Sequence, residues 1–343
     1  MNFHIQNESN STLQTLQERY KSWFDYKLVE TSPANMHKLN WIWEKYYEKD
    51  SIATRKVSEL KIVELKMWCI QKIEAHTLTS RQFKDMKSVM NMLLDYAVEL
   101  ELIVVNPARS VRGISYKKFK PQKKKSVQEQ VYVNDEESLL IDTALEGFRK
   151  TKNTAYLAVC LNCTLACRVG ELVAIQLTDI SSDTLHIQRQ EIKNYELIEG
   201  VLHRHRYRIA YYTKSTDSDR YIPLTSISHR FLEMIIAANE EAGFHSEYLF
   251  LDNDGERMNN DVVNNVLRRL NRKINTIQKG NHSIRKTCLS NMNASKLLSD
   301  EELRTFAGHK EVSTTQRSYV FAVDTLDRRQ DAYEQAICGR IKK

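Results

Sequence analysis

The chain has 343 residues, of which 41% are hydrophobic and 28% charged, a composition typical of globular proteins rather than disordered or fibrous ones. Basic residues number 51 against 44 acidic ones, and the net charge of +7 suits a polyanionic partner without identifying one. There is no run of about 18 apolar residues, and the N-terminus lacks the basic and apolar stretches of a signal peptide. We therefore expect a cytoplasmic protein with no membrane partner.

The N-terminal third of the sequence predicts a helical domain. Residues 1–10 are polar and are expected to form a flexible N-terminus. Apolar residues at helical spacing then predict four amphipathic helices, with Ser58 and Ser80 as caps of the third and fourth, at about 11–29, 34–48, 58–73 and 80–97. Because the pair Asn106-Pro107 discourages further helix, we place this helical domain at 11–111.

A strongly basic stretch, RGISYKKFKPQKKK, follows the helical domain and predicts an interdomain linker at 112–130. Its charges either keep a solvated linker extended or lie along DNA phosphates. The second interpretation is favoured because the run is dense and joins two domains of a basic protein. The side chains expected to contact DNA are Lys117, Lys118, Lys120, Lys123, Lys124 and Lys125.

The remaining residues, 131–343, predict a second domain that is mainly α-helical with a small antiparallel β-sheet. Alternation in LHIQRQEI, YRIAYYT and RYIPL indicates strands within about 184–224. Helical patterns surround these strands, and RVGELVAIQ at 168–176 is also expected to be helical. The other predicted helices lie at about 135–149, 152–166, 226–242, 259–276, 282–295, 299–307, 313–321 and 324–338.

Three cysteines in the run AYLAVCLNCTLAC raise the question of a metal site. Cys160, Cys163 and Cys167 are spaced i, i+3, i+7, which is one face of a helix. No second Cys or His pair with zinc-finger spacing occurs elsewhere. We therefore predict core cysteines rather than zinc ligands.

Arg168 in CRVGEL lies where the pattern predicts a helix to meet a turn. Its guanidinium offers a planar fork of donors that fits phosphate oxygens. Glu171 follows three residues later, on the same helical face, where it can brace the arginine. Taken alone, Arg168 and Glu171 are more simply interpreted as an ordinary ion pair on a helix.

Two further motifs combine imidazole and guanidinium groups. His282 and Arg285 in HSIR are three apart on a predicted helix, so both project near its positive end. The segment AGH predicts a helix end with Gly308 at the C-cap, followed by His309. Short motifs of this kind also occur by chance, so each has an ordinary structural interpretation.

Tyr319 and Lys214 complete a set of groups suited to phosphate chemistry. A phenol has a pKa of about 10, so a tyrosine needs nearby cations or a base before it can attack phosphorus. A lysine between two strands can donate a proton to a leaving oxygen. Taken singly, a tyrosine among 16 and a turn lysine are unremarkable.

In their order along the chain, CRVGEL, TKS, HSIRKT and AGHKEVSTTQRSY resemble the tyrosine recombinase, or phage integrase, family. The resemblance covers nearly the whole chain. It implies a helical core-binding domain at about 11–110 and a mixed α/β catalytic domain at about 130–340. Cys167 and Lys286 depart from the family pattern, where leucine and histidine are common, but neither removes a catalytic group. The C-terminal half is most similar to integrases of conjugative transposons and prophages.

The resemblance implies a role for each residue of the set. Tyr319 would attack a scissile phosphate and form a 3′-phosphotyrosine, while Lys214 protonates the leaving 5′-oxygen. Arg168 and Arg285 would hold the phosphate oxygens, His282 would assist proton transfer, and His309 would donate to the phosphate or position the tyrosine. Glu171 would support Arg168.

The resemblance also implies partners. These are double-stranded DNA recombination sites and a homotetramer on two duplexes that exchanges the helix at about 324–338, aided by an excisionase or a host DNA-bending protein. No cofactor or metal is implied, and the expected location is cytoplasmic and nucleoid-associated. We expect a site-specific recombinase that integrates and excises a mobile element. An Xer-like chromosome-dimer resolvase and a non-catalytic DNA-binding relative are the alternatives.

Overall fold

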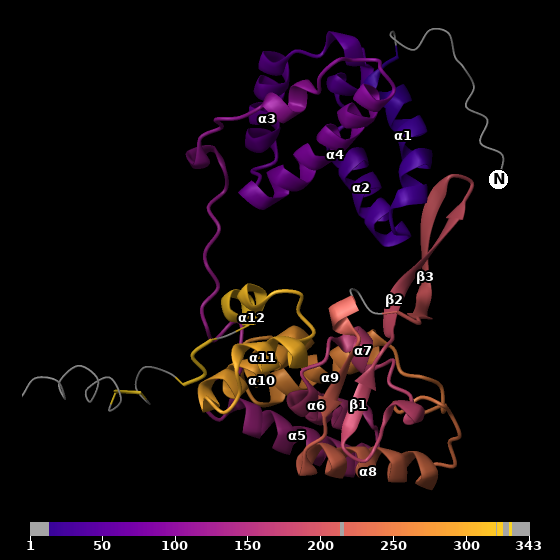
Figure 1. Cartoon of the computed structure of the whole chain (residues 1–343), viewed down its shortest axis with the longest axis vertical. Coiled ribbons are helices and arrows are strands. Elements are labelled where there is room, and N and C mark those ends of the chain that lie inside the picture. Colours follow the sequence, from indigo (N-terminus) through magenta and orange to yellow (C-terminus); the bar gives the residue numbers. More distant parts are fainter. Residues whose placement is uncertain (1–13, 213–215, 320, 325–328, 331–343) are drawn as a thin grey trace, which may run out of the picture. The chain divides into compact units, whose positions relative to one another are not determined.

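A computed structural model describes residues 14–212, 216–319, 321–324 and 329–330 (Figure 1). The side chains of residues 216 and 317–319 are outside the description. Contacts divide the chain into two compact units. The helical unit contains the residues up to Lys124 together with 193–205. The catalytic unit contains residues 125–192 and those from Arg206 onward.

The helical unit is built from four helices with an aromatic core. Their bounds are α1 Leu16–Glu30, α2 Pro33–Tyr46, α3 Ile62–Ala75 and α4 Ser80–Glu99. The rings of Tyr20 and Trp43 stack with centroids 3.9 Å apart. The Tyr47 hydroxyl, at the end of α2, donates to the carbonyl of Met86 on α4 at 2.7 Å. Such a bond satisfies a polar group that burial would otherwise penalise.

Two predicted helix starts in this unit are wrong. The third helix begins at Ile62, because Ser58 lies in a separate 3-10 turn, Val57–Glu59. The fourth helix is capped by Thr79 rather than Ser80. Thr79 and Gln82 form a reciprocal capping box, with the Gln82 amide N–H donating to the threonine hydroxyl.

The first half of the basic stretch packs on the helical unit. The amide of Lys120 donates to the carbonyl of Leu78 at 2.9 Å, and the ring of Phe119 lies 5.3 Å from that of Phe83. Lys118 forms an ion pair with Glu74 on α3. The backbone before Lys120 is therefore held against the helices, while the lysine side chains at 117–125 are exposed.

The residues of the β2–β3 hairpin are divided between the two units. Its strands are β2 Gln190–Ile198 and β3 Val201–Ala210. Residues 193–205 cluster with the helical unit, where Leu202 is buried in the apolar core and the ring of Tyr195 lies 4.9 Å from that of His37. These residues fall within the second domain predicted at 131–343, because strand alternation does not indicate which core a strand joins.

In the catalytic unit, four helices surround one buried helix, α6 (Ala155–Leu165). These are α5 Glu136–Thr151, α8 Ser226–Glu241, α9 Asn260–Lys273 and α10 Asn281–Ser295. Cys160 and Cys163 on α6, and Cys167 just after it, are free thiols within this core cluster. The core interpretation of the cysteines therefore holds.

Short elements complete the catalytic unit and carry the candidate site. They are α7 Val169–Leu172, α11 Asp300–Ala307, α12 Val312–Tyr319, β1 Thr184–Ile187 and β4 Arg220–Pro223. β1 pairs antiparallel with β4, with Leu185 opposite Ile222. The described strands thus form two separate two-stranded sheets rather than one. The helical stretch predicted at 168–176 is shorter than expected and ends at Leu172.

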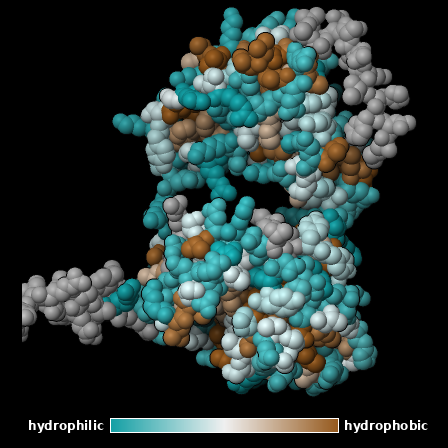
Figure 2. All heavy atoms as spheres, in the orientation of Figure 1, coloured by the Kyte–Doolittle hydropathy of each residue, from teal (hydrophilic) through white to brown (hydrophobic). Residues whose placement is uncertain are grey.

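None of the described helices is long and apolar enough to cross a membrane. Figure 2 shows hydrophilic side chains over most of the visible face, with apolar residues in limited patches.

Candidate active site

Arg168 is positioned by the abrupt end of α6. Ala166, at φ +49°, ends that helix in the left-handed region, and the Asn162 side chain accepts from the amide of Cys167 at 2.8 Å. The chain then turns so that Arg168 precedes α7. Its Nη1 donates to Oε1 of Glu171 at 2.5 Å, and its amide donates to Oε2 of the same carboxylate at 3.1 Å.

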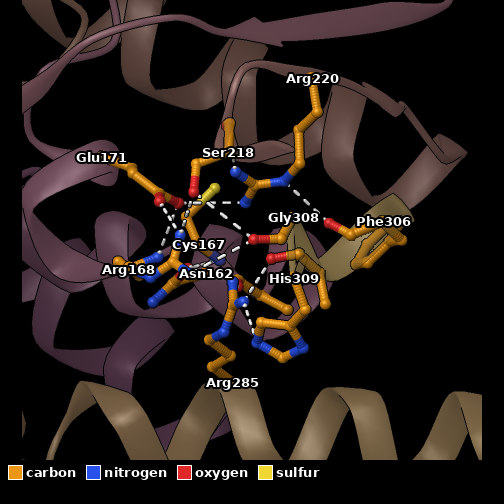
Figure 3. Close-up of polar contacts among 12 residues, drawn as sticks. Asn162, Cys167, Arg168, Glu171, Ser218, Arg220, Arg285, Phe306, Gly308 and His309 are labelled. Atoms are coloured by element: carbon orange, nitrogen blue, oxygen red, sulfur yellow. Dashed lines mark hydrogen bonds and ion pairs between the residues drawn. The ribbon is translucent and has the colours of Figure 1, made fainter. Parts of the chain in front are cut away.

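Glu171 is a buried carboxylate between two arginines (Figure 3). Its Oε2 also accepts from Nη2 of Arg220 at 3.0 Å. Burial opposes ionisation of Glu171, but the charges of Arg220, Arg168 and Arg285 outweigh it and hold the carboxyl pKa below its ordinary value. The residue is therefore ionised near neutral pH and fixes both guanidinium groups.

Arg285 joins the ends of two helices. It is fully buried on α10, and its Nη1 donates to the carbonyl of Ala166, beyond α6, at 2.6 Å. Its Nη2 donates to the carbonyl of Ala307 on α11 and lies 2.9 Å from Nε2 of His309. Carbonyls at helix C-termini carry partial negative charge and suit such a cation.

His309 follows the predicted helix end, and Gly308 is the C-cap of α11 with φ +62°. This left-handed backbone favours glycine, and a Cβ there would lie only 3.0 Å from the Cδ of Arg220, a tight contact. Burial, followed by the charges of Arg285, Arg168, Arg220 and His282, lowers the pKa of His309 to about 3. The imidazole is therefore neutral near pH 7.

His282 lies exposed on the first turn of α10. Partial desolvation by its neighbours, then the charges of Lys286, Arg285 and Arg168, lower its pKa to about 4. The His282 imidazole is therefore neutral near pH 7.

Two members of the predicted set lie wholly or partly outside the described residues. Lys214 lies outside the described residues, in the connection between β3 and β4. Tyr319 is the last residue of α12, but its side chain is outside the description. Most of the helix predicted at about 324–338 also lies outside the described residues.

Three further residues belong to this cluster and were not predicted from the sequence. Arg220 also donates from Nε to the carbonyl of Phe306 at 2.8 Å, and Ser218 accepts from Nη1 of Arg168 at 3.3 Å. Thr315 on α12 lies with its Oγ1 2.8 Å from Nδ1 of His309. Of the three, only Arg220 could have been recognised from the sequence. In RYIP, alternation along the strand places Arg220 on the buried face with Ile222, while Tyr221 is exposed.

The cluster is suited to holding a phosphate. Arg168 and Arg220 pair with the carboxylate of Glu171, and Arg285 adds a third guanidinium, so the cluster is cationic overall. Arginine forks match phosphate oxygens. Within the described residues, no group of three or more His, Cys, Asp or Glu side chains could hold a metal ion. Arg168, which is partly exposed, is held in place before a ligand arrives, and such fixed donors favour electrostatic stabilisation of a phosphoryl transition state.

The substitution Glu171→Gln tests the central ion pair. Removing the charge leaves two cations uncompensated, so we expect the free energy of unfolding near pH 7 to fall by about 3 kcal/mol. The pKa of Glu171 is lower in the folded protein than in the unfolded chain. The ionised carboxylate therefore stabilises the fold fully above the ordinary carboxyl pKa, and this stabilisation is lost as the pH falls through the pKa of the folded state. Urea unfolding across pH should show the gap to wild type shrinking below about pH 4.

The matched control is Glu146→Gln on α5, where an exposed carboxylate faces Lys150. Its effect should stay within about 0.5 kcal/mol at every pH. Equal effects of the two substitutions, or a gap for Glu171→Gln that does not change with pH, would contradict the assignment.

Residues 130–324 match the model of the phage integrase family. No curated protein matches the sequence. Among solved structures, an integrase of transposon Tn1549 in complex with transposon right-end DNA is 18% identical with a TM-score of 0.68, covering 95% of this chain and 100% of that one.

Two structures of lambda integrase have similar folds. A dimer bound to a COC′ core site is 13% identical with a TM-score of 0.62, covering 90% of this chain and 98% of that one. A tetramer bound to a Holliday junction is 14% identical with a TM-score of 0.60, covering 88% and 77%. These matches confirm the predicted fold class, a helical protein with a small antiparallel β component.

The family match also confirms the predicted enzyme class, a DNA breaking and rejoining recombinase. Because the match spans more than half of the chain, this protein belongs to the phage integrase family.

Proposed function

We propose that this chain is the integrase of a mobile element and that it cuts and rejoins DNA at recombination sites through a 3′-phosphotyrosine. The observation that carries the proposal is the convergence of Arg168 and Arg285 around Glu171 and His309 in a member of the family. The folds shared with a transposon integrase and lambda integrase support a mobile element over a chromosome-dimer resolvase.

In the proposed reaction, the Tyr319 oxygen attacks the scissile phosphorus. The bond from phosphorus to the 5′-oxygen breaks, and the 3′ end remains joined to the tyrosine. His282, neutral at neutral pH, receives the phenolic proton, and Lys214 gives a proton to the leaving 5′-oxygen. Because the phosphotyrosine bond conserves the energy of the broken phosphodiester bond, rejoining can reverse these steps.

The two arginines differ in access to a phosphate. The Arg168 side chain is 28% exposed, whereas Arg285 is fully buried. A phosphate can therefore meet Arg168 directly but reaches Arg285 only after its neighbours move. We propose that DNA binding brings this rearrangement, and that both guanidinium groups then stabilise the transition-state charge.

The proposed partners are two duplex recombination sites and other copies of the chain. Lambda integrase forms a dimer on a core site and a tetramer on a Holliday junction, which supports a tetramer on two duplexes here. Exchange of the helix at about 324–338, help from an excisionase or a host DNA-bending protein, and a cytoplasmic, nucleoid-associated location are parts of the same proposal.

Covalent trapping tests the function. We expect the wild-type chain to form an adduct, stable on a denaturing gel, with a nicked duplex carrying the end junction of the element that encodes it. Tyr319→Phe removes the nucleophile and should give no adduct. Arg168→Lys replaces a fork of donors with a point charge and should slow adduct formation by about 10²- to 10³-fold.

Tyr221→Phe, which removes an exposed hydroxyl on β4, is the matched control and should react like wild type. An adduct that persists in Tyr319→Phe would refute the nucleophile. Specific DNA binding with no adduct for any variant would instead favour a non-catalytic DNA-binding relative.

The basic stretch generates a separate prediction. Exposed Lys123 and Lys124 are proposed to contact phosphates, so replacing both with alanine should reduce the slope of log affinity against log salt by about 2. The exposed pair Lys150 and Lys152, which face Glu146 and Glu241, is the control. Titrations at several salt concentrations would contradict the proposed contacts if the two double variants had equal slopes.

A further inference from the structure

We propose that Thr315 is a positioning residue: its hydroxyl holds His309 in the tautomer that accepts a hydrogen bond from Arg285. This ties α12, the helix that ends at Tyr319, to a phosphate-binding arginine. The inference deepens the proposed function and rests on it.

A continuous chain of polar contacts carries the inference. Nη2 of Arg285 lies 2.9 Å from Nε2 of His309, and Nδ1 of His309 lies 2.8 Å from Oγ1 of Thr315. All three side chains are buried, with exposed fractions of 0%, 4% and 2%. The three groups belong to α10, to the turn after α11, and to α12.

Donor and acceptor chemistry determines where the imidazole proton lies. A guanidinium donates and cannot accept, so Nε2 of His309 must accept from Arg285. A neutral imidazole then carries its proton on Nδ1, and the Thr315 hydroxyl oxygen can accept that proton. A doubly protonated ring would set one N–H against another, and burial among the arginines already lowers the His309 pKa to about 3.

This assignment changes the role expected for His309. Its Nε2 is the acceptor of a bond from Arg285 and does not point a proton at a phosphate in this arrangement. Arg285 Nη2 is instead held between His309 and the carbonyl of Ala307, while Nη1 is held by the carbonyl of Ala166. His309 therefore orients Arg285.

Thr315 provides the connection to the nucleophile's helix. It lies four residues before Tyr319 on α12, about one helical turn away. Anchoring Thr315 to His309 therefore sets the position of α12 relative to Arg285. Thr314, the adjacent residue, is exposed, so the chain provides a matched control on the same helix.

A kinetic experiment uses the full chain and the nicked duplex described above. Thr315→Val keeps the side-chain shape and removes the hydroxyl, so we expect adduct formation to slow by about 10- to 100-fold through mispositioning. The affinity for intact DNA should be unchanged, since the hydroxyl is buried against His309. Thr315→Ser should retain most of the wild-type rate, and Thr314→Val should match wild type.

A spectroscopic experiment does not depend on activity. In the full chain with nitrogen-15-labelled histidine, long-range proton–nitrogen correlation spectra distinguish the two neutral tautomers from imidazolium. His309→Gln assigns the signal. We expect wild type at about pH 7 to show His309 neutral with its proton on Nδ1, and we expect this signal to change in Thr315→Val but not in Thr314→Val.

The outcomes separate the two proposals. A proton on Nε2, an imidazolium, or identical rates for the two valine variants would overturn the role of Thr315. Loss of DNA affinity together with rate in Thr315→Val alone would do the same, because it indicates general damage to the fold. No adduct from wild type, with the Nδ1 tautomer present, would refute the recombinase function and leave the tautomer assignment standing.

Discussion

The ionised carboxylate of Glu171, bound by Arg168 and Arg220, is the interaction on which the rest of the site depends. A buried carboxylate between two guanidinium groups fixes α7 against β4, and the second arginine extends the contact to the carbonyl of Phe306 on α11. Arg285 makes a parallel connection from α10 to the ends of α6 and α11. Segments far apart in sequence are thereby held around one cationic cluster.

This arrangement accounts for the protonation states of the neighbouring histidines. Desolvation and the excess of guanidinium charge lower the pKa values of both His282 and His309. Both imidazoles are therefore neutral near pH 7, and Nε2 of His309 can accept a hydrogen bond from Arg285. The cluster thus combines the charge of three guanidinium groups with two neutral imidazoles.

Local pattern predicted much of this structure. Helical periodicity identified α1, α2 and α4–α6, the spacing of Arg168 and Glu171 predicted their ion pair, and the glycine after α11 predicted its C-cap. Sequence spacing did not reveal that Arg285 is fully buried or that Ser218 joins the site, because their contacts cross long sequence separations. Thr315 is close to His309 in sequence, but their contact depends on the turn between α11 and α12, which helical spacing does not describe. Strand alternation likewise indicated strands within about 184–224 but not that residues 193–205 join the helical unit.

A DNA-bound structure of the Tyr319→Phe variant with an intact scissile phosphate tests the account most directly. The account predicts that Arg168 and Arg285 both donate to non-bridging oxygens of that phosphate, while Glu171 stays bonded to Arg168 and Arg220. A scissile phosphate bound out of reach of Arg168, or a Glu171 side chain turned away from both arginines, would contradict it.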